Sequence, residues 1–257
     1  MNKSIQSKMV LLLSPLLVFF SIISVHADDL TLAVANSTCN ATKKIGAIFE
    51  KQQHVQINYL CKSSGRLAKG LRGGSITADI YISANRKWMD YMLDSDLITP
   101  EQVTSTWGNK LVVATRNDSD LELAQWDELT SDKIKTILIG DPGTAPFGRY
   151  AKEALQSTGL WLRTRNKIET KKHITLLADI LAQSDKNTVG ILFLSNITDK
   201  LRIIYTIDKS WHSPIRYYMA PVGKAANQRQ VTELLDFIQG PEGQEIFREQ
   251  GFLINTP

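Results

Sequence analysis

Residues 140–155 read Gly140-Asp141-Pro142-Gly143-Thr144-Ala145-Pro146-Phe147-Gly148-Arg149-Tyr150-Ala151-Lys152-Glu153-Ala154-Leu155. The first nine residues include three glycines and two prolines, which is typical of a turn. Residues 137–140 before this turn form a short apolar run, which predicts a strand, and residues 148–157 have the pattern of a helix. A strand that turns directly into a helix is the building unit of an α/β fold, and it leaves backbone N–H groups unpaired at the helix start.

The same strand–turn–helix pattern recurs along most of the chain. Strands are predicted for residues 30–35, 55–60, 80–83, 110–115, 137–140 and 190–193, and helices for 41–52, 66–71, 148–157 and 174–183 and for the segment that Asn85 opens. Repeated β–α units predict mainly parallel sheets with helices on both faces.

The end of the chain indicates how these units are divided. Residues 230–239 and 241–250 have helical patterns, and residues 216–222 before them alternate as a strand does. This strand can return the chain to the part of the molecule that begins at Asp28. We therefore predict two α/β lobes with a ligand cleft at their hinge: residues 28–110 plus 219–257 form lobe I, and residues 111–218 form lobe II. Closure would bend the crossing strands near residues 111–115 and 215–222.

The first 27 residues have the features of a cleavable secretory signal. Lys3 and Lys8 precede a run without charge, residues 9–25, which ends in Val25-His26-Ala27. A membrane anchor is the alternative, and Pro15 within the run argues against it. Without Lys3 and Lys8 the formal charge falls from +4 to +2. This nearly balanced charge is unlike the basic surface of a protein that binds nucleic acid.

Cys39 and Cys61 are the two cysteines of the chain. In an exported protein an even pair favours a disulfide, because the envelope is oxidising. The alternative is two small buried apolar side chains. Each follows a predicted strand at the same edge of the sheet, which favours the disulfide.

Common catalytic and metal-binding motifs are absent from the sequence. It has no G-x-S-x-G, no G-x-x-x-x-G-K-[ST], no H-E-x-x-H and no G-x-G-x-x-G. His54, His173 and His212 lack the spacing of metal ligands, so we expect surface or packing roles for them. We expect neither a metal nor a cofactor.

Polar turns follow three of the predicted strands at the ends where ligands of open α/β sheets bind. They are Asn36-Ser37-Thr38, Ser63-Ser64-Gly65 and Pro146-Phe147-Gly148. Each precedes a helix, and a helix start attracts anions through its unpaired N–H groups and its dipole. Ordinary helix capping is the alternative for Ser37 and Ser64 taken one by one.

Five blocks of the sequence, in this order, resemble one known family. They are residues 35–41, 78–91, 108–114, 140–155 and 240–247, and they include the specific runs Lys87-Trp88-Met89-Asp90-Tyr91 and Tyr150-Ala151-Lys152-Glu153-Ala154-Leu155. Over nearly the whole mature chain they are similar to the periplasmic molybdate-binding protein of bacterial molybdate ABC transporters, the ModA type.

The resemblance implies a type II periplasmic-binding-protein fold whose two lobes close on molybdate or tungstate. The ligand would be held as an oxyanion by hydrogen bonds alone, without a metal or cofactor. The resemblance also implies that the protein is a periplasmic monomer and not an enzyme. It would deliver the oxyanion to an inner-membrane ABC permease and would have no nucleic-acid partner.

Carried over residue by residue, the resemblance implies five ligand-binding positions. Ser37 and Ser64 would each supply a hydroxyl and a backbone N–H, and Phe147 and Ile174 would each supply a backbone N–H. Phe193 stands where the family usually has a tyrosine whose hydroxyl touches the oxyanion. A charge-assisted hydrogen bond is worth about 1.5–3 kcal/mol, so losing this donor would weaken binding roughly ten- to a hundredfold unless another group compensates.

Three cations lie beside these positions in the sequence. Lys62 and Arg66 flank Ser64, and Arg149 follows Phe147. They either reach the ligand or point to solvent. The alternative ligands are sulfate, phosphate or a small organic anion. An envelope hydrolase with Ser37 or Ser64 as nucleophile is an alternative of another class.

Overall fold

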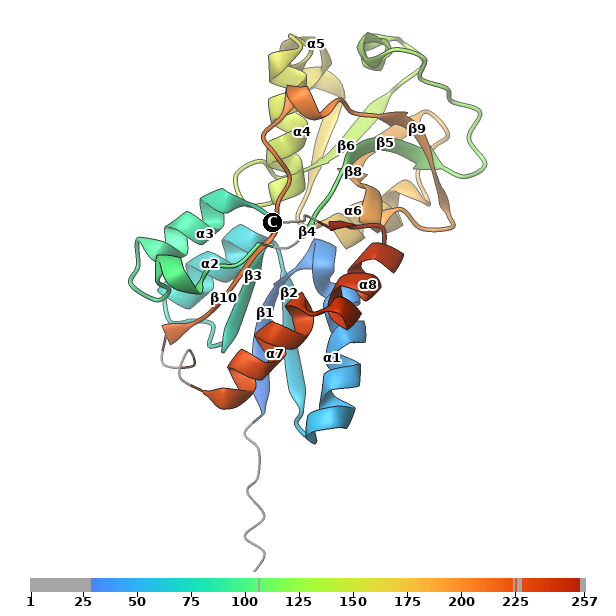
Figure 1. Ribbon diagram of the computed structural model, residues 1–257. Coiled ribbons are helices and arrows are strands. Elements are labelled where there is room, and N and C mark those ends of the chain that lie inside the picture. The colour runs from blue at the N-terminus through green and yellow to red at the C-terminus, as the bar shows by residue number, and fades with distance from the viewer. Residues whose placement is uncertain (1–28, 106, 224, 226–227, 255–257) are drawn as a thin grey trace, which may run out of the picture.

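The computed structural model describes residues 29–105, 107–223, 225 and 228–254. These residues form two α/β lobes, drawn in the lower and upper halves of Figure 1. The predicted signal peptide, residues 1–27, lies outside the described residues. Within the described part of the chain, every helix is too short or too polar to cross a membrane.

The lower lobe is built on a four-stranded sheet in the order β10-β3-β1-β2. β1 (Leu30–Ala35) lies parallel to β2 (Ile57–Lys62) and β3 (Ile80–Ser83), whereas β10 (Tyr218–Pro221) is antiparallel to β3. Alternate residues of β1 point to opposite faces, so Leu32 and Val34 join one apolar cluster and Ala33 joins another. Helices pack on both faces: α1 (Cys39–Gln53), α7 (Arg229–Gln239) and α8 (Pro241–Glu249) on the first, α2 (Ser64–Arg72) and α3 (Arg86–Leu93) on the second.

The upper lobe is built on a five-stranded sheet in the order β7-β6-β8-β5-β9. β6 (Thr136–Gly140) is parallel to β7 (Ile168–Lys171) and β8 (Thr188–Phe193), and β5 (Leu111–Arg116) is antiparallel to β8 and β9 (Leu201–Thr206). β5 enters this lobe from the hinge and therefore runs opposite to β8, which ends there. The helices of this lobe are α4 (Pro146–Ser157), the short α5 (Trp161–Thr164) and α6 (Ile174–Leu181).

Two adjacent segments of the chain connect the lobes. The first is β4 (Trp107–Gly108) with Asn109, and the second is residues 215–217, which lead into β10. They run antiparallel: the Tyr217 N–H donates to the Trp107 carbonyl at 3.0 Å, and the Asn109 N–H donates to the Ile215 carbonyl at 3.3 Å. β11 (Leu253–Ile254) also pairs with β4. The first crossing was expected at residues 111–115, but these are held inside the five-stranded sheet as β5, so the crossing lies a few residues earlier.

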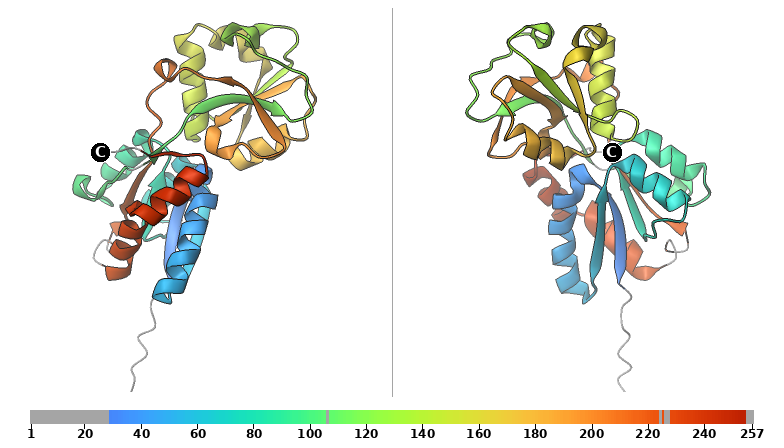
Figure 2. Two further views of the ribbon diagram at one scale, coloured as in Figure 1. Left: turned by 45° about the vertical axis from the view of Figure 1, so that its right-hand side comes forward. Right: turned by 180° about the vertical axis from the view of Figure 1, so that it is seen from behind.

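The predicted fold class, two α/β lobes with sheets flanked by helices, is confirmed, and Figure 2 shows the lobes from two further directions. Each sheet also contains antiparallel pairs, which involve β10 in the lower lobe and β5 in the upper lobe. These two strands lie next to the segments that connect the lobes. We keep the lobe boundaries at 110/111 and 218/219 as a proposal. They agree with the strands of each sheet except at Tyr218, which already belongs to β10.

Candidate functional site

The five residues singled out from the sequence line one small pocket between the lobes. The space in this pocket that a water molecule can reach is only about 10 Å³. Ser37 and Ser64 come from the lower lobe, and Phe147, Ile174 and Phe193 come from the upper lobe. The remaining lining residues are Ala35, Asn36, Ser63, Ala84, Ala145, Pro146 and His173. Segments far apart in the sequence therefore meet at a single point.

Four of the five predicted residues, all except Phe193, lie at the start of a helix. Ser37 lies in η1 (Asn36–Thr38), a 3-10 turn that leads into α1; Ser64 and Ile174 are the first residues of α2 and α6; and Phe147 is the second residue of α4. Among the hydrogen bonds of the described residues, no carbonyl or side chain accepts from the backbone N–H of any of the four. The helix dipoles add partial positive charge at the same point. The pocket thus presents donors without acceptors, which suits an anion.

The Ser64 hydroxyl is held by the backbone next to it. Its Oγ accepts from the Ala84 N–H at 3.0 Å, and Ser64 is completely buried. Because this bond uses a lone pair of the oxygen, the hydroxyl proton is left for another acceptor. The lobes touch at this place, since the Gly65 N–H donates to the Thr144 carbonyl across the cleft at 3.2 Å.

The Ser37 hydroxyl is held by two residues of the crossing segments. Tyr217 Oη donates to Ser37 Oγ at 3.1 Å, and Asn109 Nδ2 donates to Tyr217 Oη at 3.2 Å. Asn109 Nδ2 also donates to Ser195 Oγ at 2.7 Å, so the chain of hydrogen bonds reaches the upper lobe. Burial raises the pKa of Tyr217, which keeps its proton at neutral pH. Tyr217 and Asn109 were not singled out from the sequence as site residues, although Asn109 lies in the family-like block 108–114 and Tyr217 in the predicted strand 216–222.

Phe193 forms an apolar wall of the pocket. It is fully buried at the end of β8, and its ring packs against those of Phe147, Tyr150 and Tyr217 at centroid distances of 6.1–6.2 Å. Its side chain offers no hydrogen-bond donor, so on this side the anion would meet only a ring edge or face.

Comparisons with known proteins show the family to which the chain belongs. The profile of the family described as bacterial extracellular solute-binding protein matches residues 30–253. The molybdate-binding protein ModA of Escherichia coli is 31% identical over 238 residues, which cover 89% of this chain and 91% of that protein. The chain is a ModA-type solute-binding protein.

Solved structures share the fold of this solute-binding protein. The periplasmic molybdate-binding protein of Azotobacter vinelandii matches with a TM-score of 0.78 at 18% identity, over 89% of this chain and all of that one (100%). The sulfate-binding protein SubI of Mycobacterium tuberculosis matches with a TM-score of 0.74 at 12% identity, over 90% of this chain and 88% of that one. Proteins named for different oxyanions thus share this fold, so the fold alone does not identify the ligand.

Cations of the solute-binding protein surround the pocket without lining it. Lys62, Arg66, Lys69 and Lys172, all exposed, line a wider opening that shares Ser63 and His173 with the small pocket. Among the described residues, no carboxylate lines this opening. Arg149 faces a different opening, and its Nε pairs with Glu153 Oε1 at 2.8 Å. Of the three cations considered from the sequence, Lys62 and Arg66 therefore lie at the rim, and Arg149 lies away from it.

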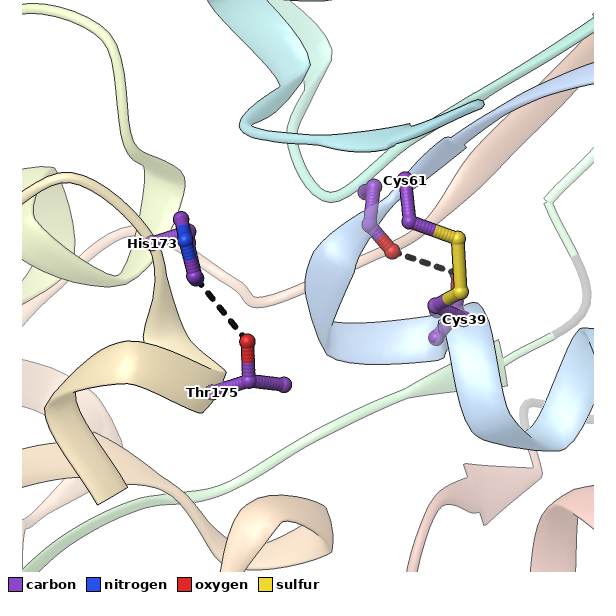
Figure 3. Close-up of a disulfide and its surroundings, with 6 residues drawn as sticks. Cys39, Cys61, His173 and Thr175 are labelled. Atoms are coloured by element: carbon purple, nitrogen blue, oxygen red, sulfur yellow. Dashed lines mark hydrogen bonds between the residues drawn. A yellow bond between two sulfur atoms is a disulfide. The ribbon is translucent and has the colours of Figure 1, made fainter. Parts of the chain in front are cut away.

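His173 has a role that the sequence did not indicate. It was expected to be a surface or packing residue, but it lines the pocket and caps α6. Its Nδ1 accepts from the Leu176 N–H at 3.2 Å and lies 2.9 Å from Thr175 Oγ1. Figure 3 draws the contact with Thr175 as a dashed line. Burial, together with the nearby Arg66, lowers the pKa of His173. The neutral ring can therefore serve as the cap, which fixes the helix start at Ile174.

The disulfide expected between Cys39 and Cys61 is present (Figure 3). Cys39 is the first residue of α1, just after Ser37, and Cys61 lies in β2, just before Ser63 and Ser64. The bond thus ties together the two segments that carry the serines of the pocket.

No group of three or more His, Cys, Asp or Glu side chains in the described residues is arranged to hold a metal ion. Neither serine hydroxyl is bonded to an imidazole or a carboxylate in that part of the chain: Ser37 bonds to Tyr217 and Ser64 to Ala84.

Proposed function

We propose that this protein captures molybdate or tungstate from the periplasm and delivers it to an ABC permease of the inner membrane. The observation that carries the proposal is the meeting of Ser37, Ser64, Phe147 and Ile174 at one pocket, each with a free backbone N–H at a helix start. The curated relative named for molybdate supports the choice of ligand.

The donors provide enough free energy for this role. Four backbone N–H groups and two serine hydroxyls converge, and each hydrogen bond to a charged group contributes about 1.5–3 kcal/mol before the cost of desolvation. Micromolar affinity needs about 8 kcal/mol in total. The donors come from both lobes, so a ligand that bonds to all of them stabilises the closed form. The permease would then recognise the closed lobes.

Neutral donors also give selectivity. A cation attracts many anions, whereas fixed N–H and O–H donors require an acceptor at each position. A protonated oxygen would place a donor against a donor, so the pocket favours a fully deprotonated tetrahedral oxyanion. Phe193 and the rim cations favour the alternative, which is sulfate, phosphate or a small organic anion.

Isothermal titration of the exported, purified protein with molybdate, tungstate, sulfate and phosphate tests the proposal. We expect micromolar or tighter binding of molybdate and tungstate and far weaker binding of the other two. Preference for sulfate or phosphate would assign the protein to that alternative. Labelling of Ser37 or Ser64 by a serine-reactive fluorophosphonate would support a hydrolase instead.

A further inference from the structure

Two buried polar atoms of the pocket have no partner within the described residues. They are Asn36 Nδ2 and Ser63 Oγ, and both residues line the small pocket. Ser63 is only 4% exposed. A buried donor or hydroxyl without a partner costs about 1–3 kcal/mol, so native proteins rarely keep one without a use.

Neither side chain makes the hydrogen bond to the neighbouring helix or turn that its position would usually provide. Ser63 is the N-cap residue of α2, where a serine Oγ normally accepts from the first turn of the helix. Here the Ser63 side chain makes no capping bond, and its backbone carbonyl accepts from the Arg66 and Leu67 N–H groups instead. Asn36 opens η1 directly after β1; its backbone carbonyl accepts from the Cys39 N–H, whereas its side-chain nitrogen has no partner among the described residues.

Both atoms suit the ligand of the pocket chemically. The Asn36 amide nitrogen is a donor, and the Ser63 hydroxyl can donate. They lie beside Ser37 and Ser64, the two serines whose hydroxyls are already oriented. The opposite wall, Phe193, offers no donor. A tetrahedral anion has four oxygens with several lone pairs each, so it can accept from more groups than the six donors named above.

We propose that Asn36 Nδ2 and Ser63 Oγ donate hydrogen bonds to the bound oxyanion and add to the binding set. This inference rests on the proposed function. It assigns two specificity-determining residues that compensate for the apolar wall at Phe193. It also explains why the protein keeps two unsatisfied polar atoms: they serve the ligand-bound state rather than the stability of the empty protein.

Two variants, Asn36→Ala and Ser63→Ala, test this inference, with Asn40→Ala as the control. Asn40 is exposed near the start of α1 and lines neither opening. We expect each pocket variant to weaken molybdate binding roughly tenfold, as loss of one donor to a charged ligand predicts. The melting temperature of the ligand-free variants should stay unchanged or rise, because an unsatisfied buried group has been removed. The control should change neither quantity.

Phe193→Tyr, made in the wild type and in Asn36→Ala, tests whether the added donors compensate for the apolar wall at Phe193. Phe193→Tyr adds a hydroxyl at the apolar wall, and we expect it to restore much of the affinity that Asn36→Ala removes while adding little to the wild type. Unchanged affinity in both Asn36→Ala and Ser63→Ala would overturn the inference, since neither atom would then contribute to holding the ligand. A lower melting temperature with unchanged affinity would assign them a structural role.

The outcome for the wild-type protein separates this inference from the proposed function. If the wild type binds sulfate or phosphate in place of molybdate, the proposed ligand is wrong, and the variants are then compared with the anion that binds. If the wild type binds molybdate and the two pocket variants bind it equally well, the function stands and only the two added donors are rejected.

Discussion

The direction of the Ser37 hydroxyl follows from the hydrogen bonds behind it. Asn109 Oδ1 accepts from the N–H groups of Lys110 (2.9 Å) and Ser195 (3.4 Å), so its amide nitrogen must face Tyr217. Tyr217 then accepts from Asn109, and Ser37 Oγ is the acceptor left for the tyrosine proton among the bonds of the described residues. Ser37 therefore has its own proton free for the pocket.

At this scale we predict that Tyr217→Phe weakens oxyanion binding about five- to tenfold, which corresponds to roughly 1–1.4 kcal/mol. Without the phenol, the Ser37 hydroxyl can rotate and loses its fixed direction. Calorimetry on Tyr217→Phe, Ser37→Ala and the double variant measures the effect. The double variant should bind as weakly as Ser37→Ala alone, because Tyr217 acts through Ser37.

Thr164→Val is the matched control for Tyr217→Phe. Thr164 is fully buried, and its hydroxyl donates to the Leu160 carbonyl at 2.9 Å, away from the pocket. Thr164→Val should lower the melting temperature, because a buried hydrogen bond is lost, and should leave the affinity for the oxyanion unchanged. Additive effects of Tyr217→Phe and Ser37→Ala would contradict the proposed orientation of the hydroxyl.

At the scale of elements, α4 starts against the end of β6. A Cβ built on Gly148 would lie 2.1 Å from the Gly140 carbonyl oxygen, and one built on Gly140 would lie 2.7 Å from the Gly148 nitrogen. Only glycine at both positions lets the helix start approach the strand this closely. This contact sets the place of the Phe147 N–H, and it explains two of the three glycines in residues 140–155, Gly140 and Gly148.

We predict that Gly148→Ala destabilises the protein by about 1–3 kcal/mol or more, the usual cost of overpacking against backbone. It should also weaken oxyanion binding, because the first turn of α4 must move away from β6 and carries the Phe147 N–H with it. Thermal unfolding and calorimetry measure the two effects. Gly159→Ala is not a suitable control, since Gly159 has a positive φ of 74°. Ser157→Ala at the far end of α4 serves instead, and affinity should not change there.

The elements near the pocket were the most predictable from the sequence. The strand at residues 80–83 and the helix start after Asn85 are confirmed, because a fully buried strand and an Asn N-cap leave clear patterns. β7 and β9 were not predicted. Both are edge strands of the upper sheet with half-exposed, partly charged residues, so they lack the apolar run that marks a buried strand.

The candidate site was predictable only in part, for a physical reason. Ser37, Ser64 and Phe147 lie in turns that end strands, and such turns are visible in a sequence. Tyr217 acts through a contact with Ser37, far away in the chain, which single-sequence patterns do not contain. The cap at His173 is a local contact with Leu176, but histidine is not among the residues that usually mark a helix start, so the pattern was not recognised. That the five predicted residues bind the ligand stays a prediction until binding is measured.

At the scale of the whole molecule, the exposed charges around the pocket are unevenly placed. Lys62, Arg66 and Lys69 lie at the rim on one lobe and Lys172 lies on the other, with no carboxylate among the residues that line this opening. Charges grouped at an entrance raise the local concentration of an oppositely charged ligand and speed its association. Their effect is screened by salt, because the Debye length is only about 8 Å at physiological ionic strength.

We predict that Lys62→Gln combined with Lys172→Gln slows association of the dianion roughly three- to tenfold at low salt and leaves dissociation nearly unchanged. The rim cations act before the lobes close and do not line the pocket. Stopped-flow kinetics at several salt concentrations measures both rates. The association rate of the wild type should fall toward that of the variant as the salt concentration rises. Lys51→Gln with Lys133→Gln removes the same charge from one exposed site in each lobe away from the opening and should leave association unchanged. Faster dissociation in the rim variant would show instead that these lysines touch the bound ligand.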